Sequence, residues 1–278
     1  TLIIVTFESA HCLPDLEPLI RECKHVIIVD NGSTDGTASL ASQRFPHAHV
    51  IALERNYGFG AANNRALEKL TTPFALLLNP DCQITPGHLA VLVSEAHRYP
   101  DAAILAPQLT NARGEPDLSY RWPSSLWMSR GPGASGPSCV GFVTGAAMLL
   151  VPANMGNANR FDESFFLYYE DDDLCLRLFN DKHPIILVPP VVTLHRSRGS
   201  VRGKTRVRSE YWRGYHHAQS KLRFAEKHLS VAHSSRLKRK TLALALLSWP
   251  LRLLLLSPRM LARLTGRITG LMRWSPHA

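Results

Sequence analysis

The fold is decided by a short stretch near the N-terminus, residues 26–35, which reads VIIVDNGSTD. Its first four residues are apolar and the residues that follow are small and polar. Three more apolar runs are followed in the same way by polar or glycine-containing residues and a helical stretch: Leu2 to Val5, Val50 to Leu53 and Phe74 to Leu78. This alternation predicts an α/β fold with a mostly parallel central sheet covered on both faces. Ligands of such sheets bind beyond the carboxyl ends of the strands, so the polar residues there form the candidate site.

The rest of the chain has less regular patterns. Residues 109–139 are rich in proline and glycine, which predicts a loop-rich segment. Ala146 to Val151 and Ile185 to Val188 are expected to be further strands, and residues 211–227 a helix packed back on the body.

The charge of the chain is concentrated in its last 52 residues. Residues 1–226 hold 22 Lys and Arg and 22 Asp and Glu, whereas residues 227–278 hold 10 basic residues and no acidic one. Such a tail indicates an anionic partner, either a membrane surface or a nucleic acid. Thr241 to Leu256 is too apolar for a solvated nucleic-acid arm and, at 16 residues, short for a span of about 20. We therefore expect residues 1–228 to form the α/β domain and residues 229–278 a basic amphipathic helical tail on an anionic membrane, with no nucleic-acid partner.

The cysteines and the start of the chain bear on the compartment. The five cysteines are odd in number and form no CxxC pair, so neither a disulfide framework nor a zinc site is indicated. The chain opens directly on an apolar run without the pattern of a secretory signal. A reducing compartment is expected.

Two motifs follow strands in the first third of the chain. In residues 29–35, small polar residues let the backbone turn while Asp30 and Ser33 can hydrogen-bond a ligand; the alternative is a turn whose Ser33 or Thr34 caps a helix. In residues 56–64, NYGFGAANN, the glycines allow close approach of the backbone to a ligand, although a plain strand-to-helix connection would also fit.

Two acidic motifs follow. Asp81 ends the run Leu78-Asn79-Pro80-Asp81 at the exposed end of a strand, where a carboxylate can bind a divalent cation or cap a helix. Residues 161–174, FDESFFLYYEDDDL, place four adjacent carboxylates after an aromatic cluster. One of them can act as a general base, because crowding and burial raise carboxyl pKa values; an acidic first turn of a helix is the alternative.

Taken together and in this order, these segments resemble the family 2 glycosyltransferases, particularly their bacterial rhamnosyltransferase-like branch. The resemblance covers residues 1–227 and rests on the opening strand, the DNGSTD element, the segment 56–64, the NPD form of the DxD motif and the segment 161–177. It implies a glycosyltransferase A-type, Rossmann-like nucleotide-binding fold with a C-terminal helical, membrane-associating extension.

The resemblance also implies roles for individual residues. Asp171 matches the general base of an inverting transfer, with Glu170 beside it. Asp81 and His195 would bind Mg²⁺ or Mn²⁺. Apart from the resemblance, the charge of the basic residues suits closure over the donor diphosphate or contact with a lipid diphosphate, and a solvated or phospholipid-facing loop is the alternative; these residues are Arg196, Arg198, Arg202, Lys204, Arg206 and Arg208. The nucleotide sugar would be held by Thr6, Glu8, Asp30, Asn31, Ser33, Asn56, Gly58, Phe59, Gly60, Asn63, Asn79 and Asp81. Glu8 departs from the asparagine that is more usual at its position, and Asn180-Asp181-Lys182 replaces a glycine.

The function implied is transfer of one sugar, L-rhamnose from dTDP-rhamnose, to a lipid-linked saccharide during synthesis of a cell-wall, lipopolysaccharide or O-antigen polysaccharide. The enzyme would be peripheral on the cytoplasmic face of a bacterial inner membrane. UDP-galactofuranose, UDP-glucose or another nucleotide sugar are alternative donors. A nucleotidyltransferase is disfavoured because residues 6–10, TFESA, are not a basic glycine-rich loop. A non-catalytic glycan-binding or nucleic-acid-binding protein is the remaining alternative.

Overall fold

The chain folds into two compact units in the computed structural model, which describes residues 1–124, 127–196, 199, 206–254 and 257–276. The first unit comprises residues 1–162 and 171–201, and the second comprises residues 163–170 and 202–278. Each unit is described by itself.

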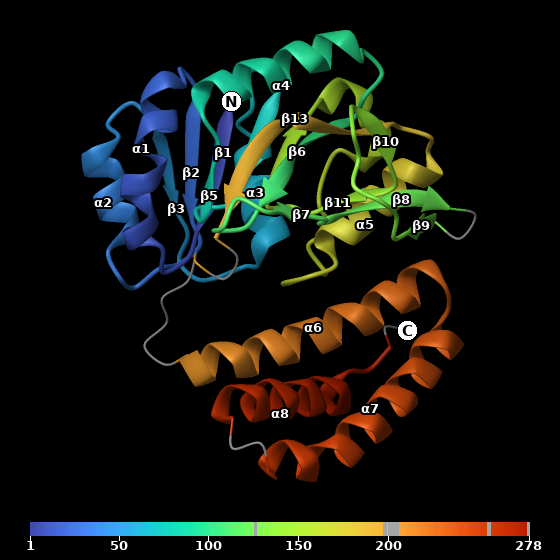
Figure 1. Cartoon of the computed structure of the whole chain (residues 1–278). Coiled ribbons are helices and arrows are strands. Elements are labelled where there is room, and N and C mark those ends of the chain that lie inside the picture. The colour runs from blue at the N-terminus through green and yellow to red at the C-terminus, as the bar shows by residue number, and fades with distance from the viewer. Residues whose placement is uncertain (125–126, 197–198, 200–205, 255–256, 277–278) are drawn as a thin grey trace. The chain divides into compact units, whose positions relative to one another are not determined.

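The first unit is an α/β structure (Figure 1). Its main sheet contains β1 (Leu2–Thr6), β2 (Val26–Asp30), β3 (His49–Ala52), β4 (Ala75–Leu78), β5 (Cys82–Gln83), β6 (Ile104–Thr110), β7 (Pro116–Asp117), β10 (Ser138–Val140), β12 (Ala147–Leu150) and β13 (Ile185–His195). Its α-helices are α1 (Leu13–Glu22), α2 (Thr37–Arg44), α3 (Phe59–Leu67), α4 (Pro86–Arg98) and α5 (Glu170–Asn180).

The central sheet is mostly parallel, as expected from the sequence. Its strands lie in the order β10-β13-β6-β12-β4-β1-β2-β3, with β5 paired to β13 and β7 paired to β6. Strands β3, β2, β1, β4, β6 and β13 point the same way, and β12 and β10 run against them. The carboxyl ends of β1, β2 and β4 therefore meet at one edge.

Helices cover both faces of this sheet because its strands are apolar on both sides. Successive side chains of β1 point to opposite faces of the sheet. Leu2 and Ile4 pack with α1, α2 and α4, whereas Ile3 packs with α3 and α5. Figure 1 shows α1 and α2 on one side of the sheet and α3 and α5 on the other. The first turn of α4 is capped by Thr85, whose hydroxyl accepts the His88 N–H at 3.1 Å. Asp81 is thus not a helix cap, and neither Ser33 nor Thr34 caps α2, which starts after Gly36.

Two expectations about the later strands need correction. Residues 109–139 are not simply loop, since they contain β7, β8 (Tyr120–Ser124) and β9 (Trp127–Ser129), and β8 lies between β9 and β11 (Phe142–Val143) in a three-stranded sheet. The strand expected at 185–188 continues to His195 through a register shift between Val188 and Val192. Pro189 and Pro190 fall in that shift, where their missing N–H groups do not interrupt the ladder.

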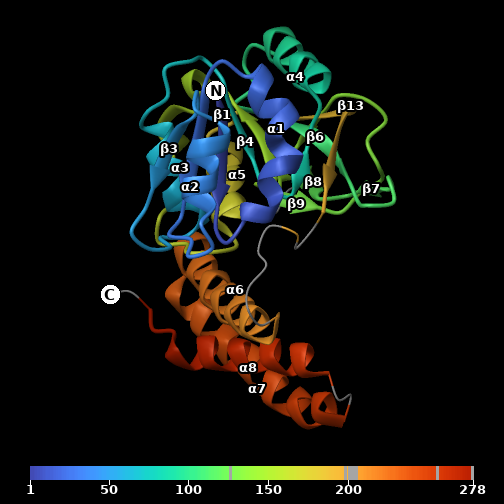
Figure 2. The same cartoon turned by 90° about the vertical axis from the view of Figure 1, so that its left-hand side faces the viewer.

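The second unit is helical. It contains α6 (Arg206–His228), α7 (Val231–Leu254) and α8 (Pro258–Arg273), which pack against one another (Figure 2). Helices α6 and α8 are in close contact at Gly266. A Cβ there would lie 1.9 Å from the Tyr211 carbonyl oxygen, so this approach requires glycine. A small core of Ala218, Leu222, Leu271 and Trp274 joins the helices.

Two further observations concern the helices and the cysteines that the structure describes. Among the described helices, none combines the length and apolar content needed to cross a bilayer. The five cysteines are free thiols.

Candidate functional site

The site is built at the edge of the sheet where the parallel strands end. Thr6 and Asp30 are partners in the β1–β2 register and are the last residues of their strands. Asn79 and Asp81 follow β4, the other neighbour of β1. The polar residues that the sequence placed after separate strands therefore come together at one edge.

Asp30 is the centre of the first loop. Its side chain is 2% exposed and accepts hydrogen bonds from the Thr6 hydroxyl at 3.1 Å, the Ser33 N–H at 3.0 Å and the Ser33 hydroxyl at 2.5 Å. Asp30 and Ser33, expected to be available to a ligand, are bonded to each other. In this state they hold the shape of the loop.

Glu8 also holds this loop. Its carboxylate accepts the Thr34 N–H at 2.8 Å and the Thr34 hydroxyl at 2.9 Å, and its own N–H donates to Ser33 Oγ at 2.8 Å. The backbone of Glu8 is left-handed, with φ of 53°. The unusual glutamate is thus a structural clamp on residues 33 and 34.

Asn31 connects this loop to the loop before α3. Its amide donates to Asn56 Oδ1 and to the Gly58 carbonyl, both at 3.0 Å, and its oxygen accepts the Tyr57 N–H at 2.8 Å. The two loops touch at Gly32, where a Cβ would lie 2.5 Å from the Arg55 carbonyl carbon. The two candidate nucleotide-binding loops brace each other.

Helix α3 carries the next candidate residues. Asn63 is buried and donates to the Phe59 carbonyl at 3.0 Å, within its own helix. Asn64 exchanges two hydrogen bonds of 2.9 Å with the backbone of Phe161, against whose ring Phe59 packs edge-on. Gly60 is buried beside them. These contacts fix α3 to the segment that leads toward α5.

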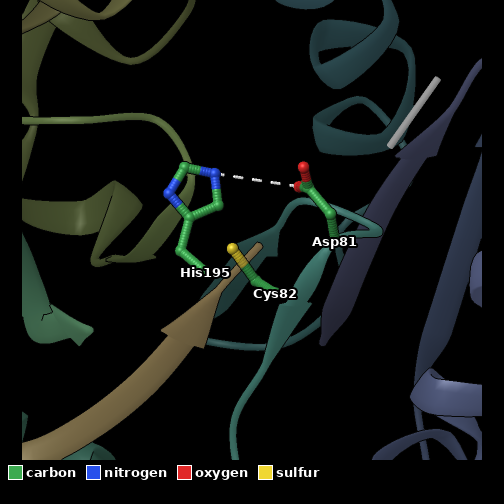
Figure 3. Close-up of side chains that lie close together, drawn as sticks. All are labelled: Asp81, Cys82 and His195. Atoms are coloured by element: carbon green, nitrogen blue, oxygen red, sulfur yellow. Dashed lines mark ion pairs between the residues drawn. The ribbon is translucent and has the colours of Figure 1, made fainter. Parts of the chain in front are cut away.

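Asp81, Cys82 and His195 form one group, with ligand atoms within 4.8 Å of one another (Figure 3). His195 Nε2 lies 3.9 Å from Asp81 Oδ1. The group exists because β5 pairs with the end of β13, which sets Cys82 opposite His195. Burial, followed by the Asp81 charge, raises the pKa of the Cys82 thiol well above its ordinary value.

A cation would find suitable donors here. The carboxylate and the imidazole are oxygen and nitrogen ligands of the kind that Mn²⁺ accepts, and carboxylate also suits Mg²⁺. Nδ1 of His195 is buried and has no hydrogen-bond partner among the described residues. The protonated thiol contributes less, because the thiolate is the metal ligand.

Gly199 is a neighbour of Asp81 that the sequence did not reveal. Its N–H donates to Asp81 Oδ2 at 3.0 Å, while the Arg196 N–H donates to the Asp81 carbonyl at 2.9 Å. Arg196, the first residue of the expected basic loop, forms an ion pair with Asp15. Arg208 is exposed, whereas Arg198, Arg202, Lys204 and the side chain of Arg206 lie outside the described residues.

Asp171 lies in the first turn of α5. Its two carboxylate oxygens accept the N–H groups of Gly145 and Asp172, both at 3.0 Å. Burial nonetheless raises its pKa above the ordinary value, against these hydrogen bonds and one from the Thr144 side chain. Gly145 and Thr144 carry no sequence signal as partners of a carboxylate and were missed.

The other carboxylates of the acidic segment differ in surroundings. Burial, and next the charge of Asp171, raise the pKa of Asp172 to about 8. Asp173 is fully buried and pairs with Arg177 at 2.9 Å, a structural role. Glu170 is 6% exposed and is grouped with the helical unit. Asp171 thus combines raised basicity with partial exposure.

The chain is similar in sequence to known glycosyltransferases. Residues 1–155 match the family model described as Glycosyl transferase family 2. The chain is 30% identical over 208 residues to N-acetylglucosaminyl-diphospho-decaprenol L-rhamnosyltransferase of Mycobacterium tuberculosis, covering 63% of this chain and 67% of the relative. It is 27% identical over 188 residues to the low-salt glycan biosynthesis hexosyltransferase Agl10 of Haloferax volcanii, covering 64% and 60%.

Solved structures show the same fold at low identity. A mannosyltransferase of Pyrobaculum calidifontis, in complex with GDP-Man and Mn²⁺, matches with a TM-score of 0.58 at 16% identity, covering 98% of this chain and 86% of that one. S. aureus TarS with UDP-GlcNAc matches with a TM-score of 0.54 at 18% identity, covering 84% and 68%. The expected glycosyltransferase A-type fold is confirmed, and the chain belongs to glycosyl transferase family 2 and is a glycosyltransferase.

Proposed function

We propose that the chain transfers L-rhamnose from dTDP-rhamnose to a lipid-linked saccharide, with inversion at the anomeric carbon, in the synthesis of a cell-envelope polysaccharide. The similarity to the mycobacterial rhamnosyltransferase supports the sugar and the lipid-linked acceptor. The observation that carries the transfer reaction is the braced edge of the sheet. The loops after β2 and before α3 are hydrogen-bonded to each other there, and Asp81, 3.9 Å from His195, follows β4 on the other side of β1.

In this proposal the nucleotide sugar is held by that edge. Thr6, Glu8, Asp30, Ser33, Asn31, Asn56 and the backbone of residues 58–60 shape the pocket for the base and ribose. Asn63 and Asn79 complete its wall. Because these side chains already bond to one another, the pocket is preorganised and binding costs little ordering of loops.

The diphosphate is proposed to meet Asp81 and His195. When bound there, Mg²⁺ or Mn²⁺ would neutralise the negative charge that grows on the leaving nucleotide. Asp81 would hold the cation through its carboxylate and His195 through its imidazole. The β5–β13 pairing keeps the two side chains at this spacing without a ligand.

Asp171 is proposed to be the general base. It takes the proton of the acceptor hydroxyl as that oxygen bonds to the anomeric carbon, and the bond from this carbon to the nucleotide diphosphate breaks. The N–H groups of Gly145 and Asp172 orient the carboxylate, and its raised pKa makes it a stronger proton acceptor. Glu170 is proposed to assist from the preceding position.

The enzyme is proposed to act as a peripheral protein at the cytoplasmic face of a bacterial inner membrane. A lipid-linked acceptor is confined to such a surface. Residues 229–278, basic and free of acidic side chains, provide the attraction to anionic lipid.

A thermal-shift screen of the full chain tests the donor. The protein is heated with dTDP-, UDP- and GDP-sugars, in Mg²⁺ or Mn²⁺ and then in EDTA. We expect a shift confined to dTDP-rhamnose that is lost in EDTA and weakened in Asp81→Ala but kept in Asp101→Ala, which changes an exposed carboxylate. A metal-dependent shift confined to a UDP-sugar would overturn the rhamnose assignment, and no shift with any sugar would overturn the transfer proposal.

A further inference from the structure

Two segments from distant parts of the chain meet beside Asp81. One is formed by Arg196 and Gly199, which follow β13 and both donate backbone hydrogen bonds to Asp81. The other is η1 (Ala10–Cys12), the short 3₁₀ helix that follows β1. His11 of η1 links the two, because its Nε2 lies 2.8 Å from the Gly199 carbonyl oxygen. A carbonyl oxygen only accepts, so Nε2 of His11 carries the proton and donates.

Gly199 connects His11 to the Asp81 carboxylate. Its carbonyl accepts from His11, and its N–H donates to Asp81 Oδ2 at 3.0 Å. The backbone of Gly199 also passes close to its neighbours, since a Cβ there would lie 3.1 Å from the Asp81 Cβ and 2.7 Å from the Arg196 carbonyl oxygen. A continuous path of hydrogen bonds therefore runs from η1 to the carboxylate.

The backbone of η1 is a firm support for the imidazole. The Ala10 N–H donates to Asp35 Oδ2 and the Ser9 N–H donates to Thr37 Oγ1, both at 3.1 Å. The Cys12 N–H donates to the Ser9 carbonyl at 2.8 Å. The residues on both sides of the histidine are thus fixed to their surroundings, which suits a side chain that holds another group in place.

The orientation of the Asp81 carboxylate decides whether it can share a cation with His195. Oδ2 accepts the Gly199 N–H, and Oδ1 is the oxygen that lies 3.9 Å from His195 Nε2 (Figure 3). Rotation of the carboxylate would move Oδ1 away from the imidazole. Partners that orient metal-binding side chains typically contribute about 10- to 100-fold to metal affinity. A support that acts through one further residue should lie at the lower end of this range.

The ion pair between Arg196 and Asp15 of α1 is a weaker candidate for this role. The two side chains are 50% and 42% exposed, and ion pairs in water contribute little. His11 is partly buried, and its hydrogen bond reaches the residue that contacts the carboxylate itself.

We infer that His11 is a positioning residue of the proposed cation site: through the backbone of Gly199 it holds the Asp81 carboxylate in the orientation that faces His195. The inference rests on the proposed binding of Mg²⁺ or Mn²⁺ by Asp81 and His195. It adds a residue that acts on this site through another.

Mn²⁺ binding to the full chain, followed by electron paramagnetic resonance without donor or acceptor, tests the inference. Gln and Met side chains have similar lengths but only Gln has an N–H, so His11→Gln and His11→Met differ mainly in the hydrogen-bond donor. We expect His11→Met to raise the Kd for Mn²⁺ about tenfold and His11→Gln to stay within about threefold of the wild type. His49→Met, at an exposed site on β3, is the control and should bind like the wild type.

The amide of Gly199 gives a second measurement that needs no metal. In protein labelled with isotopic glycine, its resonance is the one that Gly199→Ala removes. We expect its hydrogen exchange to be faster in His11→Met than in the wild type and slow again in His11→Gln, because the hydrogen bond to Asp81 opens more often without the support. His11→Leu also lacks a donor and repeats the comparison if His11→Met does not fold.

Two results would overturn the role of His11. One is Mn²⁺ affinity and Gly199 exchange that the loss of the donor leaves unchanged. The other is a His11→Gln variant that binds Mn²⁺ as weakly as His11→Met, because the hydrogen bond would then not be the cause.

Asp81→Ala separates this inference from the proposed function. Wild-type protein that binds Mn²⁺ no better than Asp81→Ala would overturn the proposed cation site and with it the role of His11. Binding that depends on Asp81 but is unchanged in His11→Met would overturn the role of His11 alone. Sugar transfer by the same wild-type protein is assayed separately, so a failure of the transfer proposal is seen independently of both.

Discussion

Asp171 is a carboxylate whose two oxygens are both oriented by backbone N–H groups, from Gly145 and Asp172. That geometry leaves the side chain little freedom, so its position is set before any acceptor arrives. Preorganisation of this kind is what a general base requires.

Asp171→Asn should keep donor binding and lose transfer, because the amide cannot accept the acceptor proton. General-base catalysis contributes about 10²- to 10⁴-fold, so we expect kcat to fall by that order while the donor Kd stays within about threefold. Turnover assays and calorimetry measure the two quantities. Asp181→Asn, an exposed site beyond α5, is the control, and undiminished turnover in Asp171→Asn would refute the base assignment.

Asp172 should make stability depend on pH. Burial and next the Asp171 charge raise its folded-state pKa to about 8, with Arg121 opposing the shift, whereas an unfolded aspartate ionises near pH ~4. Between these values the folded state binds more protons, so the free energy of unfolding falls as pH rises through this window.

Asp172→Asn removes that penalty. We expect its Tm to exceed the wild-type value by about 3 °C or more at pH 9, with the difference shrinking toward pH 5. Melting curves across this range test it. Wild-type and variant Tm profiles that run parallel would contradict the shifted pKa.

At the scale of elements, the loop after β2 contains two glycines that need their freedom from a Cβ for different reasons. Gly32 and Gly36 both have positive φ, of 77° and 83°. A Cβ on Gly32 would lie 2.5 Å from backbone of Arg55, whereas a Cβ on Gly36 would meet nothing within 4 Å. The two positions separate the cost of the backbone conformation from the cost of the contact.

Gly36→Ala should destabilise the fold by about 1–2 kcal/mol, the cost of a left-handed residue with a side chain. Gly32→Ala should cost more and also weaken donor binding, because the clash pushes the two braced loops apart. Urea unfolding and donor titrations of both variants provide the comparison. Equal losses of stability and unchanged donor affinity would show that the loop contact does not matter.

At the scale of the molecule, the helical unit is held together by its last helix. Ala218 and Leu222 of α6 are buried in one cluster with Leu271 and Trp274. The Lys238 ammonium donates to the Trp274 carbonyl at 2.7 Å, which ties α7 to the end of α8. A cut between α6 and α7 therefore removes packing partners from α6.

Removing residues 229–278 should release the protein from membranes and leave the α/β unit folded. Helix α6 should lose protection from hydrogen exchange because its buried residues become exposed, while the central strands keep theirs. Exchange measured by mass spectrometry and vesicle pelleting test both parts, with the full chain as control. Membrane attachment that persists after truncation would refute the role of the tail.

The sequence by itself determined β1, β2, β3, β4 and β12 and the positions of Asp81 and Asp171 after a strand and in an acidic helical turn. These depend on local physics: continuous apolar runs form covered strands, and a polar residue after such a run lies at the edge of the sheet. The predicted starts of β1 and β2 agree with the structure for this reason. The acidic first turn of α5 was likewise readable from adjacent carboxylates.

Only the tertiary structure decided what those residues meet. His195 joins Asp81 because β13 continues past Pro189-Pro190 and pairs with β5, which no local pattern indicates. Gly145 donates a hydrogen bond to Asp171, 26 residues away in the sequence, and Asn31 donates one to the Gly58 carbonyl, 27 residues away. The exposure of Leu244 and Leu247 on α7 also emerged only in the fold, because composition does not say which leucines a neighbouring helix covers. Hydrogen bonds and packing between distant segments depend on strand register and helix placement, which the whole chain sets together.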